Sequence, residues 1–204
     1  MITPEQVETA RTPEELRRFV AEIRARVEEN PAELQVAREK KGIYKKFVDE
    51  IIPLAQAADY LCDPEDRLQP VLGNQGYDVI VLDKEGKPKG KIEIGKPYDG
   101  KAVADDAKLL KERGFGKVRV GDLGSGLLEI AARILRTAKD KAIKDYRDCT
   151  LMIVGAVLPP MEIERSLLSN SADDLANELR AISYNAKKVV FVVPALEKCY
   201  AIQG

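Results

Sequence analysis

The stretch Gly73–Gly100 constrains the fold more than any other part of the chain, because it predicts a β-hairpin. Tyr77–Asp83 and Lys89–Ile94 are short runs rich in β-branched residues, which is typical of strands. A tight turn centred on Glu85-Gly86 separates them. Such a turn makes the two strands antiparallel neighbours, so the rest of the chain must build onto a sheet.

The position of this turn also predicts which residues face each other across the hairpin. If the strands pair symmetrically about it, Asp78 lies directly opposite Glu93, with Cβ atoms about 5 Å apart on one face. Two carboxylates that close repel each other unless a positive charge, such as a divalent cation, lies between them. The alternative is that Asp78 caps a turn and Glu93 pairs with Lys91 or Lys89 on a solvent-facing strand.

The second strand predicts a lysine near this acid pair. Lys91 shares its face with Glu93, whereas Ile92 and Ile94 point to the opposite face and into the core. Lys96 follows the strand end, and its direction depends on how the chain bends there. Two acids and a lysine around one metal ion suit phosphodiester hydrolysis, because the metal lowers the pKa of a bound water and the lysine stabilises charge on the phosphate.

This arrangement resembles the PD-(D/E)XK nuclease superfamily, which has the restriction-endonuclease-like fold. The match is an acid at the start of a strand, a hairpin, an apolar–Glu–apolar run, a helix and a further strand, over roughly residues 43–158. The resemblance implies that Asp78 and Glu93 are the paired motif acids and bind Mg²⁺ or Mn²⁺. It also implies a third acid from the preceding helix, for which Glu50 or Asp49 is the candidate.

The chain departs from the family pattern at the lysine. The family places this lysine two residues after the glutamate, where this chain has Gly95. Lys96, one residue further on, and Lys91, two residues before Glu93, are the candidates to replace it. The resemblance therefore implies either a divergent metal-dependent nuclease or a catalytically inactive nucleic-acid- or protein-binding module of the same fold.

Composition narrows the available chemistry. The 204 residues include no histidine, which excludes a histidine general base and any metal site that needs imidazole. Oxygen ligands remain, and these favour Mg²⁺ or Mn²⁺. The 33 basic and 34 acidic residues give a net charge of −1, so a nucleic acid would have to bind a local patch.

The hairpin predicts such a patch. Its lysines suit a phosphate backbone, although lysines also solubilise and protect exposed strand edges. The basic residues are Lys84, Lys87, Lys89, Lys91, Lys96 and Lys101.

The whole sequence predicts an α/β fold with N-terminal helices. Residues 1–62 read as a helical segment that packs on the core, with helix starts at Thr3-Pro4 and Thr12-Pro13. A long third helix is expected over Ala32–Leu61, and Pro53 should kink or restart it. Residues 63–204 read as an α/β core domain, and the two parts are expected to form one compact unit.

Within residues 63–204, alternating strands and helices predict a mixed central β-sheet, with the antiparallel hairpin at one side and helices flanking it. In the helix expected over Leu123–Tyr146, basic residues that include Lys141 alternate with acids, which predicts a solvent-exposed face. Further strands are expected over Pro70–Leu72, Lys117–Val120, Thr150–Leu158, Val189–Val193 and Cys199–Ile202, helices over Lys101–Arg113, Leu123–Tyr146 and Asp173–Tyr184, and a loop over residues 161–172.

A glycine-rich turn gives a different functional hypothesis. Gly121–Gly126 lies between a predicted strand and a helix, where backbone amides favour an anion. The segment Lys117–Leu135 is similar to the first motif of S-adenosylmethionine-dependent methyltransferases, which implies a cofactor binder. Against this, the next strand ends at Pro159-Pro160 without an acid to hold a ribose.

The sequence also predicts a location. No run of about 18 apolar residues is present, so no membrane span is expected. The polar N-terminus lacks the apolar region of a signal peptide. Cys62, Cys149 and Cys199 are far apart and are expected to be free thiols, which indicates the cytoplasm.

Overall fold

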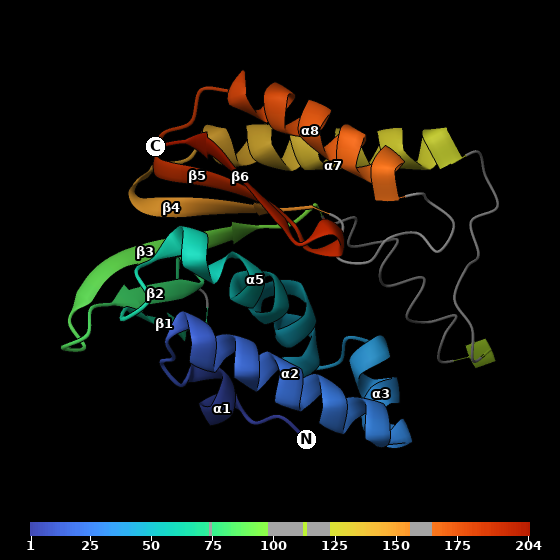
Figure 1. Cartoon of the computed structure of the whole chain (residues 1–204), viewed down its shortest axis with the longest axis vertical. Helices are drawn as coiled ribbons and strands as arrows, with labels where there is room; N and C mark the ends of the chain where they lie inside the picture. The colour runs from blue at the N-terminus through green and yellow to red at the C-terminus, as the bar shows by residue number, and fades with distance from the viewer. Residues whose placement is uncertain (74, 98–111, 114–122, 156–164) are drawn as a thin grey trace.

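Figure 1 shows a central β-sheet between two layers of helices. The computed structural model describes residues 1–73, 75–97, 112–113, 123–155 and 165–204. Over these residues the sheet has six strands in the order β1-β2-β3-β4-β5-β6. The N-terminal helices lie on one face, and α7 and α8 lie on the other. The expected α/β class with a mixed sheet is confirmed.

The sheet joins an antiparallel meander to parallel strands. The meander is β1 (Arg67–Pro70), β2 (Val79–Leu82) and β3 (Pro88–Gly95). Strand β4 (Tyr146–Val154) is parallel to β3, β5 (Ala186–Val193) is parallel to β4, and β6 (Lys198–Gln203) is antiparallel to β5. Helices α7 (Leu123–Ala142) and α8 (Arg165–Arg180) precede β4 and β5, and a 3₁₀ turn, η2 (Pro194–Leu196), precedes β6.

The first two helices begin where the sequence predicts. Helices α1 (Pro4–Glu8) and α2 (Pro13–Glu29) each follow a threonine N-cap and start with proline. Both have a capping box, in which the threonine hydroxyl and a side chain three residues later satisfy each other's backbone N–H.

The predicted third helix is interrupted at the expected place near Pro53, but also at Gly42, where continuity was expected. The chain instead forms α3 (Pro31–Arg38), α4 (Ile43–Lys46), a π-helical turn η1 (Phe47–Ile51) and α5 (Ile52–Leu61). Between α3 and α4, Lys40 and Gly42 have φ angles of 49° and 54°. These left-handed conformations end a right-handed helix.

The π-helical turn directly precedes Pro53. Proline has no N–H to donate to the carbonyl four residues earlier, so the α-helical ladder cannot run through it. The N–H of Ile52 bonds instead to the carbonyl of Phe47, five residues back. The turn buries two consecutive acids, Asp49 and Glu50.

Other element boundaries differ from the predicted ones. Strand β1 begins before Pro70, and β4 begins at Tyr146 rather than Thr150. The expected loop over 161–172 is wrong where it is described, because α8 begins at Arg165. An apolar stripe extends this helix through the region: Leu168, Ala172, Leu175, Ala176 and Leu179 are all buried.

The hairpin register is confirmed. Val79 pairs with Ile92 and Ile80 with Lys91, and a bulge after Val81 shifts the pairing beyond that point. The predicted helix Lys101–Arg113, except its last two residues, and the predicted strand Lys117–Val120 lie outside the described residues.

Two apolar cores lie on the two faces of the sheet. Ile92 and Ile94 face the N-terminal helices, as expected. Leu151, Ile153 and Phe191 face α7 and α8. Alternate residues of the central strands therefore belong to different cores.

Candidate functional site

Asp78 lies immediately before β2, beside the carboxyl-terminal end of β3. Its N–H donates to the carbonyl of Ile92 at 2.9 Å. Its Oδ2 accepts a hydrogen bond from the N–H of Ile94, also at 2.9 Å. These two bonds anchor Asp78 at the end of the hairpin, whereas the side chains of Asp78 and Glu93 have different partners, Lys46 and Lys141.

Glu50 reaches the hairpin from the π-helical turn. Lys96 Nζ lies 2.6 Å from Glu50 Oε1, so the lysine after β3 turns towards this helix. Lys46 Nζ lies 2.9 Å from Glu50 Oε2 and 3.4 Å from Asp78 Oδ1. Lys46 therefore links a carboxylate of the helical layer to a carboxylate of the hairpin. Asp49, the other candidate for a third acid, pairs instead with Lys40 at 2.7 Å.

Glu93 is held from the opposite side of the sheet. Its Oε1 accepts from Nζ of Lys141 on α7. A Cβ atom at Gly95 would lie 3.7 Å from Lys141 Cγ, so the Lys141 side chain packs over this glycine. The family's motif lysine would occupy position 95, and here a lysine from a different element lies over it.

We group six residues as the acid–lysine cluster, which consists of two parts: Glu50, Asp78, Lys46 and Lys96 are joined on the side of the N-terminal helices, and Glu93 pairs with Lys141 on the side of α7. Their side chains are between 10% and 22% exposed, so their charges interact more strongly than charges in bulk water.

Two of the lysines are held in the charged state. Burial opposes the charge of Lys46, but its contacts with Glu50 and Asp78 outweigh burial and raise its pKa. Burial also opposes the charge of Lys141, and Glu93 outweighs it, so the pKa of Lys141 is raised. Both ammonium groups therefore stay positive at neutral pH.

Each of the three carboxylates contacts at least one lysine. In the part of the chain that the structure describes, no three histidine, cysteine or acidic side chains converge as a metal site. Glu50 Oε2 is buried, and its contact is with Lys46 Nζ at 2.9 Å. A cation at these oxygens would have to displace Lys46.

Sequence reasoning missed Lys46 and Lys141. A signal for Lys46 was present, because it precedes Glu50 by four residues, the spacing of neighbours on one helical face. Lys141 carried no such signal. It reads as part of a solvated helix face, and only the packing of α7 on the sheet brings it to Glu93.

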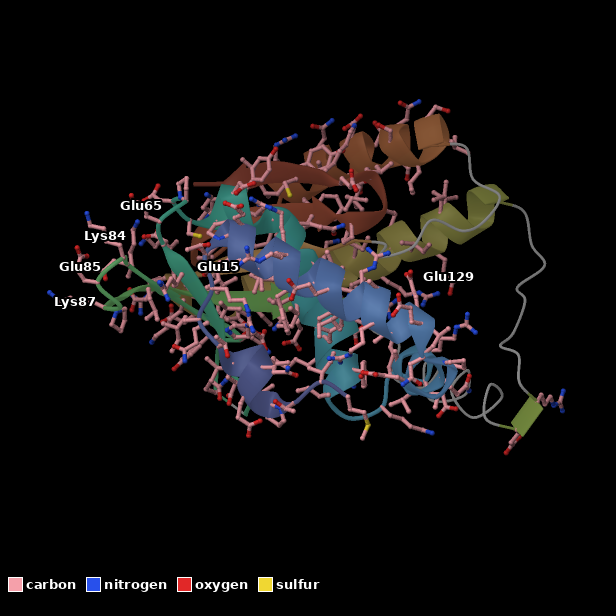
Figure 2. The ribbon with its side chains drawn as sticks, turned by 60° about the horizontal axis from the view of Figure 1, so that its bottom comes forward. Glu15, Glu65, Lys84, Glu85, Lys87 and Glu129 are labelled. Atoms are coloured by element: carbon pink, nitrogen blue, oxygen red, sulfur yellow. The ribbon has the colours of Figure 1, made fainter. Side chains whose placement is uncertain are left out.

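The lysines of the predicted basic hairpin have different surroundings in the structure. Figure 2 shows Lys84 and Lys87 at the projecting turn. Lys89 is held by Asp63 and Asp66 at 2.6 and 2.7 Å. Lys91 is exposed, with Nζ 5.0 Å from the centroid of the Tyr77 ring. Of the other two lysines of the expected patch, Lys96 belongs to the acid–lysine cluster, and Lys101 lies outside the described residues.

Comparison with known proteins found no matching family model, no matching curated protein and no matching solved structure. Among the described helices, none is both long enough and apolar enough to cross a membrane.

Proposed function

We propose that the chain is a divergent, metal-dependent nuclease-like protein that hydrolyses phosphodiester bonds of nucleic acid at the acid–lysine cluster. The supporting observation is the Lys46 bridge, which brings Glu50 of one layer and Asp78 of another to a common point. Among the described elements, three antiparallel strands come before α7 and a β4 that is parallel to β3, and this order supports the proposed likeness to the restriction-endonuclease-like fold.

The donor set suits a hard divalent cation. Mg²⁺ and Mn²⁺ prefer carboxylate oxygens, which Asp78 and Glu50 would supply in place of their contacts with Lys46, and Glu93 would join them only by leaving Lys141. When bound, the cation would supply a water of lowered pKa and neutralise phosphate charge.

In this proposal the lysines stabilise negative charge on the substrate and position the acids. Lys141 lies against Glu93, and its raised pKa keeps it able to stabilise negative charge on a phosphate. Lys96 holds Glu50 in position and is the second candidate for this role. Lys91 lies on the open hairpin, where it would contact the nucleic-acid backbone.

A second candidate function is binding of nucleic acid without catalysis. The observation that favours it is the charge balance, because a lysine already neutralises each carboxylate of the cluster. Such a module would bind phosphate backbones and would be insensitive to the Asp78→Ala substitution.

Two other expectations stay predictions. Gly121 and Asp122 of the glycine-rich turn lie outside the described residues, and thermal stabilisation by S-adenosylmethionine would test that hypothesis. The three cysteines are free thiols, which supports a cytoplasmic location.

A cleavage assay tests the proposed function. Fluorescently labelled DNA and RNA, single- and double-stranded, are incubated with protein and Mg²⁺ or Mn²⁺. Wild type should cleave at least one of them, and Lys141→Ala should be slower by about a hundredfold, the usual effect of losing one charge-stabilising group. Lys139→Ala, at an exposed site of the same helix, is the matched control. Binding without cleavage by wild type would favour the second candidate.

A further inference from the structure

A separate charged pocket lies where the α1–α2 connection meets strand β1. Figure 2 places Glu15, one of its residues, on the side of the molecule from which the hairpin turn projects. The cavity has a volume of about 410 Å³. Three arginines, two glutamates and an aromatic ring line it: Arg11, Arg18, Arg67, Glu15, Glu22 and Phe19.

The backbone fixes Arg11 beside Arg67. The N–H of Arg11 donates to the carbonyl of Leu68 at 3.1 Å, and the N–H of Leu68 donates back at 2.8 Å. These two bonds join the α1–α2 connection to Leu68 of β1, the residue after Arg67.

The Arg11 side chain is also held in place. Its Cζ lies 3.8 Å from the centroid of the Phe19 ring, so the guanidinium packs against the ring face. Its Nη1 donates to the carbonyl of Thr9 at 3.0 Å. A positioned guanidinium loses little conformational entropy when it binds a ligand.

The two glutamates only partly neutralise the arginines. Glu15 is committed to the helix start, because its Oε2 accepts from the N–H of Thr12 at 2.9 Å. This bond, followed by the charges of Arg67 and Arg18, lowers the Glu15 pKa. Glu22 Oε1 lies 3.9 Å from Arg18 Nε. Both side chains are 67% exposed, so this ion pair is weak.

We propose that this pocket binds a phosphate dianion through Arg11, Arg18 and Arg67. Guanidinium groups present paired N–H donors that match the oxygens of a phosphate. Three guanidiniums from the connection, α2 and β1 approach the cavity from different elements, which suits a tetrahedral oxyanion better than a planar carboxylate. The site is independent of the acid–lysine cluster, and the ligand is either free phosphate or a phosphomonoester.

Calorimetric titration at low salt with inorganic phosphate, and separately with phenyl phosphate, tests this site. Wild type should bind at least one ligand saturably, and the preferred one identifies the source. Arg67→Ala and Arg18→Ala should each weaken binding by about tenfold or more, because each removes a charge-assisted contact. Glu22→Gln should strengthen it by removing a repelling carboxylate. Both arginines are exposed, so these variants should fold normally.

Two controls make the result decisive. Arg17→Ala alters the neighbouring residue of the same helix, whose side chain pairs with Asp59 at 2.7 Å, and should leave affinity unchanged. Lys141→Ala should also leave it unchanged, which separates this site from the acid–lysine cluster. Absence of saturable binding to wild type, or equal weakening by Arg17→Ala and Arg67→Ala, would overturn the proposal.

Discussion

Lys46 is the residue on which the acid–lysine cluster depends. Its ammonium lies between Glu50 and Asp78, two carboxylates that would otherwise repel each other. A divalent cation would take the same oxygens. In the proposed metal-bound state Lys46 and the cation would therefore exclude each other, whereas in the structure Lys46 holds the two acids together.

Removal of Lys46 should strengthen cation binding. Lys46→Met leaves the carboxylates without their internal partner, so we expect Mn²⁺ affinity to rise by about tenfold or more, which corresponds to one modest charge interaction. Isothermal calorimetry measures the change. Lys45→Met, at an exposed neighbouring site, is the control. Unchanged or weaker Mn²⁺ binding by Lys46→Met would show that Lys46 does not occupy the cation's place.

Glu33 predicts a pH dependence that arises outside the cluster. This carboxylate is 5% exposed, and it accepts hydrogen bonds from the Tyr44 hydroxyl and, at 2.8 Å, from Arg26. The Tyr44 bond is the main reason why its pKa is lowered, and Arg26 adds to the effect against the opposing influence of burial. A lowered pKa stabilises the fold above the unfolded-state pKa of about 4.3, and this stability is lost as the pH falls further.

Substitution of Glu33 should therefore lower the free energy of unfolding most at neutral pH. Glu33→Gln should lower the free energy of unfolding at pH 7, and its difference from wild type should shrink between about pH 5 and pH 3. Urea unfolding at several pH values measures this. Glu29→Gln, at an exposed site of α2, controls for loss of one acid. A difference that stays constant with pH would contradict the role of the Glu33 charge.

At the scale of elements, features that depend on a few adjacent residues could be predicted from the sequence. Features that depend on how distant elements pack could not. The threonine–proline helix starts and the register about Glu85-Gly86 follow from a few adjacent residues. The break at Gly42 was missed, because the apolar spacing continues across it, whereas Pro53 marked the interruption that begins α5. The contact between Glu93 and Lys141 depends on how α7 packs on the sheet, which no local pattern specifies.

Helix α5 should be a major contributor to stability. Leu54 is fully buried in the core between this helix and the sheet. Leu54→Ala should lower the free energy of unfolding by about 3 kcal/mol, through lost burial and the cavity left behind. Leu128→Ala, at a position of α7 that is 73% exposed, should change it by less than about 0.5 kcal/mol. Urea denaturation measures both, and equal effects would contradict this assignment.

At the scale of the whole molecule, the two helical layers share one sheet. Met152 of β4 belongs to the core with the N-terminal helices, whereas the adjacent Leu151 belongs to the core with α7 and α8. Loss of either layer would expose one face of the same strands. The cores are therefore expected to be lost together.

Unfolding should accordingly be a single transition. The chain has no tryptophan, so Phe19→Trp reports on the first core and Tyr184→Trp on the second. Urea midpoints from the two fluorescence probes and from circular dichroism should coincide within each variant. A fluorescence midpoint that separates from the circular dichroism midpoint would show that the layers unfold independently.

The central claim is that acids from two layers form one cation site, and a calorimetric Mn²⁺ titration of wild type and Asp78→Ala tests it most directly. In the proposed site Asp78 would contribute a carboxylate, so wild type should bind Mn²⁺ saturably and Asp78→Ala should bind at least about tenfold more weakly. No binding by wild type, or equal binding by the two proteins, would contradict the metal site and the nuclease-like function that rests on it.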